Sequence, residues 1–230
     1  MIDGLSVLGL ITARGGSRGV PRKNVRMVAG RPLIAWTTGA ARASQRLDRL
    51  VLSSDDDEIM GVARALGCDV PFRRPAELAT DTAPSMDVVA HALAQLPGYD
   101  IVVLLQPTSP LRSAADIDAS LRLMVDSGAP ACVSVRPALD HPYWTYRTDG
   151  AGRLLPYVRP DAGVAARRQD LPPAFALNGA IYAARVERLL ETGSFLVDGT
   201  VAYEMPLDRS LDVDTESDLA SAADRLTARA

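Results

Sequence analysis

The sequence contains one lysine, two histidines and two cysteines among 230 residues. Cys68 and Cys132 lack metal-ligand spacing and are too few for a disulfide framework, so we expect a reduced chain in the cytoplasm. No Ser/His/Asp arrangement is evident, which argues against a triad hydrolase. No apolar run is long enough to span a membrane, and residues 5–13 carry no basic leader, so we expect them to form a buried strand. A net charge of −3 argues against a general nucleic-acid binder.

Hydrophobic residues make up 47% of the chain, enough for a large core, and apolar runs alternate with helix-like segments. This pattern predicts an α/β fold: a single three-layer, Rossmann-like domain over residues 1–230 with a mostly parallel sheet. The expected strands are residues 5–13, 49–54, 69–72, 99–106, 131–136, 179–184 and 200–206. The expected helices are residues 33–44, 55–67, 83–96, 113–128 and 215–229, with a short one after residue 184. Residues 137–177 are rich in proline, arginine and aromatic residues without helical periodicity, and predict an inserted arm.

Ligands of open α/β sheets bind at the carboxyl ends of the strands, which draws attention to the loop of residues 14–24. The stretch ARGGSRGVPRKN combines three glycines with four cations, including the chain's single lysine, Lys23. The glycines allow backbone N–H groups to surround an anion, and the cations supply charge; a flexible solvated loop is the alternative. Neither a dinucleotide fingerprint nor a Walker A motif is present. We expect Lys23 to be an exposed loop cation whose replacement leaves the fold intact.

The segment SLDVDTESDL, residues 210–219, places Asp212 and Asp214 on either side of Val213. Both carboxylates should therefore project from the same side of an extended chain. Two neighbouring carboxylates suit Mg²⁺, which also binds substrate phosphates; the alternative is that these acids only cap the last helix with Thr215. Together with the basic glycine-rich loop, they indicate a nucleoside triphosphate with Mg²⁺, and the missing Walker A motif favours nucleotidyl transfer over a P-loop ATPase.

Two other loops after strands carry polar candidates. In LLQPTSPLR, residues 104–112, two prolines stiffen the turn and hold Gln106 at the sheet edge, although a purely structural turn is equally compatible. The acids of DDDE, residues 55–58, are expected to begin a helix, with Asp55 as a candidate to face the crevice.

Five stretches, ARGGSRGVPRKN, RPAELATDTAPS, LLQPTSPLR, NGAIYA and DVDTESDL, resemble in this order the acylneuraminate cytidylyltransferases, the CMP-sialic acid synthetases. The resemblance covers residues 5–226, and PRKN separates the chain from the Kdo-activating relatives. It implies an enzyme that joins CTP to a nine-carbon 2-keto sugar acid and releases pyrophosphate. It also implies Mg²⁺ as the cofactor and a homodimer in which the arm of each subunit reaches over its neighbour's site.

The resemblance implies roles for individual residues. The nucleotide is expected to contact Arg14, Gly16, Ser17, Lys23, Asn24, Arg74 and Ser85. The sugar acid is expected to contact Gln106, Arg168, Asn178 and Tyr182. The metal is expected on Asp212 and Asp214, and the catalytic residues are expected to be Arg14, Lys23 and Asp214.

The chain departs from its relatives in the half that resembles the sugar site. Enzymes that act on N-acetylneuraminate tend to carry a lysine shortly after the HP of the arm and an arginine just before NGAIY, where this chain has Trp144 and Ala176. Legionaminate, pseudaminate and the deaminated nonulosonate are therefore candidate substrates in addition to N-acetylneuraminate. Two further alternatives are a cytidylyltransferase for another 2-keto or phosphonate acid, and a non-catalytic nucleotide-binding protein on the same fold.

Overall fold

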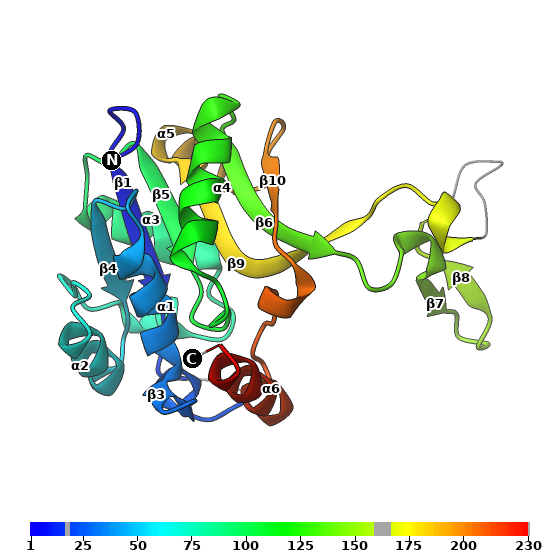
Figure 1. Ribbon diagram of the computed structural model, residues 1–230, viewed down its shortest axis with the longest axis horizontal. Coiled ribbons are helices and arrows are strands. Elements are labelled where there is room, and N and C mark those ends of the chain that lie inside the picture. The colour runs from blue at the N-terminus through cyan, green and yellow to red at the C-terminus, as the bar shows by residue number, and fades with distance from the viewer. Residues whose placement is uncertain (17–18, 159–166, 230) are drawn as a thin grey trace.

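The computed structural model describes residues 1–16, 19–158 and 167–229, without the side chain of Arg168. Its centre is a six-stranded sheet with the strand order β10-β6-β9-β5-β1-β4 (Figure 1). The strands are β1 (Val7–Thr12), β4 (Arg49–Ser53), β5 (Ile101–Leu105), β6 (Ala131–Pro137), β9 (Phe175–Arg185) and β10 (Val201–Glu204). Strand β9 runs antiparallel to β5 and β6, and the other pairs are parallel. The predicted α/β fold with a mostly parallel sheet is confirmed.

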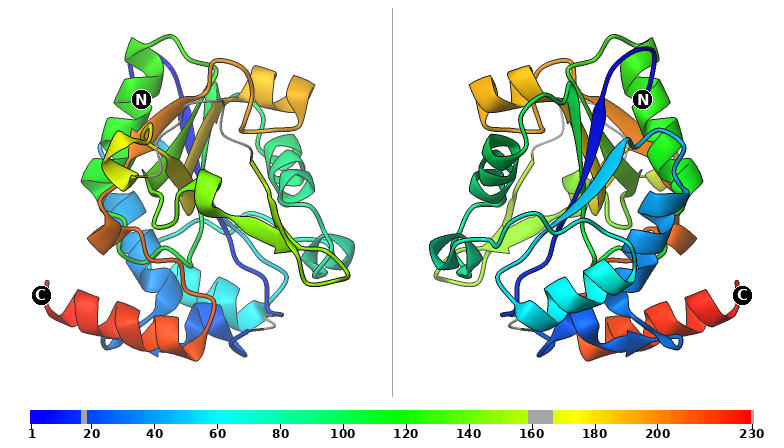
Figure 2. Two further views of the ribbon diagram at one scale, coloured as in Figure 1. Left: turned by 90° about the vertical axis from the view of Figure 1, so that its right-hand side faces the viewer. Right: turned by 90° about the vertical axis from the view of Figure 1, so that its left-hand side faces the viewer.

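Helices cover both faces of the sheet (Figure 2). They are α1 (Leu33–Ala43), α2 (Asp57–Ala65), α3 (Ser85–Gln95), α4 (Ala114–Asp126), α5 (Val186–Thr192) and α6 (Glu216–Thr227). Side chains alternate along β1, so Val7 and Ile11 pack with α1, α2 and α4, while Leu8 and Leu10 pack with α3 and α5. The apolar run at the start of the sequence thus fills both halves of the core.

A third apolar cluster lies under the carboxyl edge of the sheet. It contains Val20 from the basic loop, Val213 from between the two aspartates, and Leu219, Ala222 and Leu226 of α6. Both valines are fully buried. Burial of this cluster joins the start of the chain to its end directly beneath the loops that carry the charged residues.

Local side-chain caps explain where three of the helices begin. Ser113 caps α4 in a capping box with Asp116, and Thr215 caps α6 in the same way with Asp218. Asp56 caps α2 by accepting a hydrogen bond from the backbone of Ile59 at 3.0 Å. The helix expected to begin at residue 55 therefore begins two residues later, at Asp57, and has acids in its first turn as expected.

The strand expected at residues 69–72 is wrong. Asp69 makes a single parallel bridge to Val51, and the chain then leaves the sheet edge. Pro71 has no N–H group to continue a ladder, which accounts for the short pairing.

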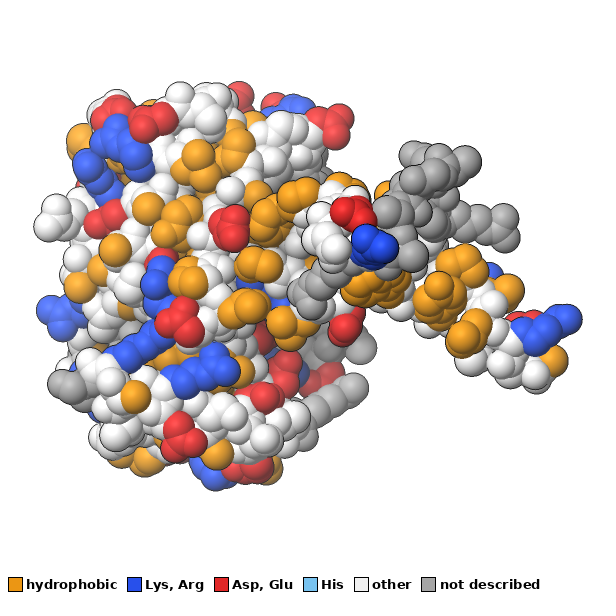
Figure 3. Space-filling view, turned by 45° about the vertical axis from the view of Figure 1, so that its right-hand side comes forward, with side chains coloured by type: hydrophobic (Ala, Val, Ile, Leu, Met, Phe, Trp, Pro, Cys, Tyr) orange, Lys and Arg blue, Asp and Glu red, His pale blue; other side chains and the backbone are white. Residues whose placement is uncertain are grey.

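Residues 138–158 and 167–174, between β6 and β9, project from the body as an arm (Figure 1). The arm carries a hairpin of β7 (Tyr146–Thr148) and β8 (Leu154–Pro156). A second two-stranded ribbon lies elsewhere, directly after the basic loop, and consists of β2 (Met27–Val28) and β3 (Arg31–Pro32). Large apolar side chains are exposed on the arm (Figure 3), namely Trp144, Tyr146, Leu154, Tyr157 and Val158. Within the described ranges, no helix has the length and apolar character needed to cross a membrane.

Candidate active site

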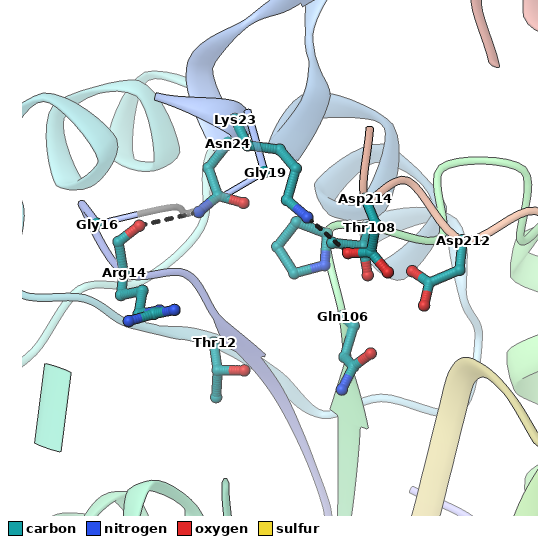
Figure 4. A pocket seen from close by; sticks show the side chains of 11 residues that line it. Thr12, Arg14, Gly16, Gly19, Lys23, Asn24, Gln106, Thr108, Asp212 and Asp214 are labelled. Atoms are coloured by element: carbon teal, nitrogen blue, oxygen red, sulfur yellow. Dashed lines mark hydrogen bonds and ion pairs between the residues drawn. The ribbon is translucent and has the colours of Figure 1, made fainter. Parts of the chain in front are cut away.

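A cavity of about 500 Å³ opens at the carboxyl ends of β1 and β5. This central cavity brings together seven of the predicted residues: Arg14, Gly16, Lys23, Asn24, Gln106, Asp212 and Asp214. Arg14 lies on one side and the two carboxylates lie on the other, with Thr12 and Gln106 between them (Figure 4). Cations and carboxylates from opposite ends of the chain therefore face one hollow.

The basic loop is held by the acids of residues 55–58. The backbone N–H of Gly15 donates to Asp55 Oδ1 at 3.0 Å, and the Arg22 guanidinium pairs with Asp56 and Glu58. These hydrogen bonds raise the pKa of Arg22 further above its ordinary value. Arg22 is thus committed to shaping the loop, and among the described residues the cations that reach the central cavity are Arg14 and Lys23.

Lys23 connects the basic loop to the acidic segment. Its Nζ donates to the backbone carbonyl of Val213 at 2.6 Å and to Asp214 Oδ1 at 3.0 Å. The side chain is only 13% exposed, so the expectation of an exposed loop cation is wrong. Val20 and Val213 belong to one apolar cluster, which draws the two segments together. Asn24 supports the same loop by donating from Nδ2 to the carbonyl of Arg14 at 3.0 Å.

The paired aspartates do not cap α6, because Thr215 and Asp218 fill that role. With Val213 fully buried between them, both carboxylates reach the central cavity, as the alternating pattern predicts. A Cβ atom at Gly19 would lie 2.2 Å from the backbone oxygen of Asp214, so only glycine permits this approach of the two loops.

The two carboxylates fit a small divalent cation. Burial raises the pKa of Asp212 and the charge of Asp214 raises it further, although a hydrogen bond from Thr108 opposes the shift. A cation between the carboxylates would relieve this repulsion. Within the described ranges no cluster of three or more His, Cys, Asp or Glu residues surrounds such a position. Two carboxylates completed by phosphate oxygens and water are the donor set that Mg²⁺ commonly uses.

A second hollow, the Arg74 cavity, adjoins the central cavity and shares Thr12 and Arg14 with it. The predicted residues Arg74 and Ser85 both line it. Arg74 is buried and donates from Nη2 to the carbonyl of Ser53 at 2.6 Å, and burial lowers its pKa to about 10. Arg14 also pairs across this hollow with Asp81 at 2.5 Å.

A third hollow, the Tyr182 cavity, shares Gln106 with the central cavity and Ser85 with the Arg74 cavity. Its other walls are mostly apolar and aromatic, and include Met86, Leu104, Leu177, Tyr182, Phe195 and Leu196. Burial, followed by the charge of Asp212, raises the pKa of the Tyr182 hydroxyl. Gln106 and Tyr182, both predicted to contact a sugar, therefore lie together next to the central cavity.

The remaining predicted residues differ in their placement. Asn178 is buried in the bulge of β9, where its Oδ1 accepts from Ser134 Oγ at 2.6 Å and its Nδ2 donates to Ser210 Oγ at 3.0 Å. It therefore ties β6 and β9 to the turn before Asp212. Ser17 lies outside the described residues. Arg168 belongs to a short 3-10 turn of the arm, and its side chain lies outside the described part of the structure.

Sequence reasoning missed several residues around the cavities. Thr12 lies near the end of the predicted strand 5–13 and Thr108 comes two residues after the predicted strand 99–106, and their position at the carboxyl edge was a usable signal. Asp81 and Phe195 carry no local pattern that points to a site, because the fold alone brings them to it. The acids at residues 55–58 gave a signal for a helix start, and only the structure shows their second role under the basic loop.

An α/β sheet with a cationic glycine-rich loop and paired carboxylates at its carboxyl edge defines a nucleotide-phosphate-binding protein of the nucleotidyltransferase class. Residues 8–185 match the cytidylyltransferase family, and the chain belongs to it, as predicted. It is 35% identical to a CMP-N,N'-diacetyllegionaminic acid synthase of Legionella pneumophila, over 94% of both chains.

It is 36% identical to an N-acylneuraminate cytidylyltransferase of Streptococcus agalactiae, over 91% of this chain, and spans half of that longer protein. The fold is also that of a CMP-2-keto-3-deoxy-manno-octonic acid synthetase solved with CTP, with a TM-score of 0.73, 18% identity, and coverage of 98% of this chain and all of the other.

Proposed function

We propose that this protein transfers CMP from CTP to a nonulosonic acid, with release of pyrophosphate and with Mg²⁺ as its cofactor. The observation that carries the proposal is that three hollows adjoin one another: the central cavity, with Arg14, Lys23 and both aspartates, shares lining residues with the Arg74 cavity and with the Tyr182 cavity. A nucleoside in the Arg74 cavity would extend its phosphates past Arg14 into the central cavity. A sugar acid in the Tyr182 cavity would then face the α-phosphate across Gln106.

The chain's own residues supply positioning and electrostatic stabilisation. The anomeric oxygen of the sugar acid attacks the α-phosphorus in line, the bond from that phosphorus to the bridging oxygen breaks, and pyrophosphate departs. Asp214 would accept the proton of the attacking hydroxyl. Arg14 and Lys23 offset the negative charge that develops on the phosphates. Asp212 and Asp214 would hold Mg²⁺, which neutralises phosphate charge when bound.

The similarity to a synthase of CMP-diacetyllegionaminic acid over 94% of both chains makes a nonulosonic acid the substrate class we propose. The apolar Tyr182 cavity supports this choice, because it offers aliphatic and aromatic contacts to acylated amino groups on such a sugar.

We also propose a cytoplasmic homodimer. The free cysteines Cys68 and Cys132, both buried, support a reducing compartment. The apolar side chains exposed on the arm support its burial against a second subunit. The homodimer is tested by analytical ultracentrifugation of the intact protein. We expect the Trp144→Asp variant to shift toward the monomer.

The function is tested by pyrophosphate release from CTP and Mg²⁺ with N,N'-diacetyllegionaminic, N-acetylneuraminic, pseudaminic and deaminated neuraminic acids. We expect turnover with at least one of them and none with UTP or ATP at the same concentration. If the protein binds CTP but turns over none of these acids, it is a nucleotide-binding protein and not an enzyme of this type.

A further inference from the structure

Arg136 lies at the carboxyl end of β6, at the root of the arm, and lines a hollow of about 460 Å³. This Arg136 cavity shares Asp212 with the central cavity and Leu177 with the Tyr182 cavity. Asn178 and Ser210, which brace the acidic segment, line it as well. Arg136 therefore shares one hollow with Asp212, the first of the paired carboxylates, and with Leu177, a wall residue of the Tyr182 cavity.

Arg136 has hydrogen-bonding capacity to spare. Among the described residues it makes no ion pair, and its Nη1 donates one hydrogen bond, of 3.3 Å, to the carbonyl of Pro137. A guanidinium has five N–H donors. The other arginine of this hollow, Arg225, donates from Nη1 to the carbonyls of Leu207 and Asp208 and so fixes the turn before the acidic segment.

A nonulosonic acid carries its carboxylate on the same carbon as the hydroxyl that attacks the phosphate. When that hydroxyl lies near Asp214, the carboxylate must lie close to the paired aspartates, whose charge repels it. Arg14 and Lys23 are proposed to face the phosphates, and the side chain of the predicted sugar contact Arg168 lies outside the described residues. Among the described side chains, the hollow that adjoins Asp212 offers Arg136 as a cation for the sugar acid. A guanidinium matches a carboxylate with two parallel hydrogen bonds.

We propose that Arg136 binds the carboxylate of the sugar substrate and thereby makes the enzyme select sugar acids over neutral sugars. The inference rests on the proposed function and extends it, because it assigns the acid group of the substrate to the Arg136 cavity and leaves the Tyr182 cavity to the rest of the sugar.

The pairing of β6 with β9 adds a structural test. Arg136 lies directly opposite Ala176 in this ladder, and directly opposed side chains share one face of a sheet. The small side chain of Ala176 leaves this face to the guanidinium. A double substitution, Arg136→Ala with Ala176→Arg, moves the cation to the facing strand and keeps it on the same face of the sheet.

The experiment compares a sugar acid that the wild type accepts with the methyl ester of the same acid, at saturating CTP and Mg²⁺. We expect Arg136→Gln to raise KM for the acid about 10- to 100-fold, the loss typical of a hydrogen bond to a charged group. We expect the KM for CTP to be unchanged, the preference for acid over ester to disappear, and Arg136→Lys to retain part of it. Arg122→Gln, on α4 and paired with Asp3 at the opposite edge of the sheet, is the matched control and should behave as wild type.

Restoration of the acid preference by the double substitution would show that the position of the charge matters, rather than the packing of one side chain. An Arg136→Gln enzyme that still prefers the acid to the ester, with wild-type KM, overturns the assignment of Arg136 and leaves the proposed function standing. A wild type that is inactive with every sugar acid overturns both.

Discussion

Lys23 is the chain's single lysine, and its ammonium lies where the basic loop meets the acidic segment. We expect Lys23→Met to lower kcat by about 10²–10³, because a preorganised cation near the phosphates is lost. Because the side chain is mostly buried and makes two hydrogen bonds, we also expect a loss of about 1–2 kcal/mol in the free energy of unfolding.

Arg26→Met is the matched control for Lys23→Met. Arg26 lies three residues after Lys23 and makes an exposed ion pair with Glu216. It should keep wild-type kcat and stability. Steady-state rates at saturating CTP and urea melts of both variants provide the measurement, and a normal kcat for Lys23→Met would remove the lysine from the catalytic proposal.

We expect substitutions of Asp212 and Asp214 to have different effects on activity. Asp214→Asn should abolish most activity, because it removes both a proton acceptor and a metal ligand, whereas Asp212→Asn should raise the Mg²⁺ concentration for half-maximal rate. In EDTA, Asp212→Asn should melt at the same temperature as wild type or slightly higher, since one of two repelling carboxylates is neutralised. Asp208→Asn, which loses an exposed pair with Arg229, is the control. Superimposable Mg²⁺ titrations for all four proteins would place the metal elsewhere.

The loop elements of the site depend on a backbone-to-backbone approach. A Cβ at Gly19 would meet the carbonyl oxygen of Asp214, so Gly19→Ala must push the basic loop away from the acidic segment. Displacement of about 1 Å at a reacting centre costs roughly 100-fold in rate, and we expect a fall of that order.

Gly61→Ala separates this effect from the general cost of a methyl group. Gly61 lies within α2, and a Cβ atom added there would meet nothing within 4 Å, so the substitution should raise stability by up to about 1 kcal/mol without changing the rate. Rates and melting temperatures of the two alanine variants are compared side by side. A Gly19→Ala enzyme with normal turnover would mean that the two loops need not touch during catalysis.

The molecule as a whole owes part of its acid stability to Asp116. Burial by itself raises the pKa of this carboxyl, but hydrogen bonds from Arg209 and Ser113 outweigh it, so the pKa lies below its ordinary value. The stabilisation is therefore complete above pH about 4, the unfolded value, and is lost as the pH falls through the lower folded value.

Asp116→Asn should therefore lower the free energy of unfolding by about 2–3 kcal/mol at pH 7, because Arg209 and Tyr203 lose a buried charged partner. The difference from wild type should narrow below pH 4. The control is Asp126→Asn, which removes an exposed pair with Arg122 and should cost less than about 1 kcal/mol. The measurement is urea unfolding of all three proteins across pH 2.5–7. If the free energies of unfolding of wild type and Asp116→Asn differ by the same amount down to the lowest pH, the charge of Asp116 is not the source of the stabilisation.

The sequence alone predicts most of the fold and the outline of the site, for definite reasons. Apolar runs identify the strands, and the alternation around Val213 predicts that both aspartates face one side. The partners of the basic loop, Asp55 and Asp56, were not predictable, because tertiary contacts decide which charges meet. Arg136 was likewise hidden, since its importance depends on the pairing of β6 with β9.

The contact between Lys23 and Asp214 spans 191 residues of chain and has a consequence for biosynthesis. At about 5–20 residues per second, roughly 10–40 s separate the synthesis of the lysine from that of the aspartate. During that interval β1, β4 and β5 can leave the ribosome and begin to pack, but the acidic segment does not yet exist. Under the proposed function, the nascent chain therefore carries the cations of the basic loop well before the two aspartates proposed to bind Mg²⁺ exist, and we expect catalysis to begin only after residue 214 has been synthesised.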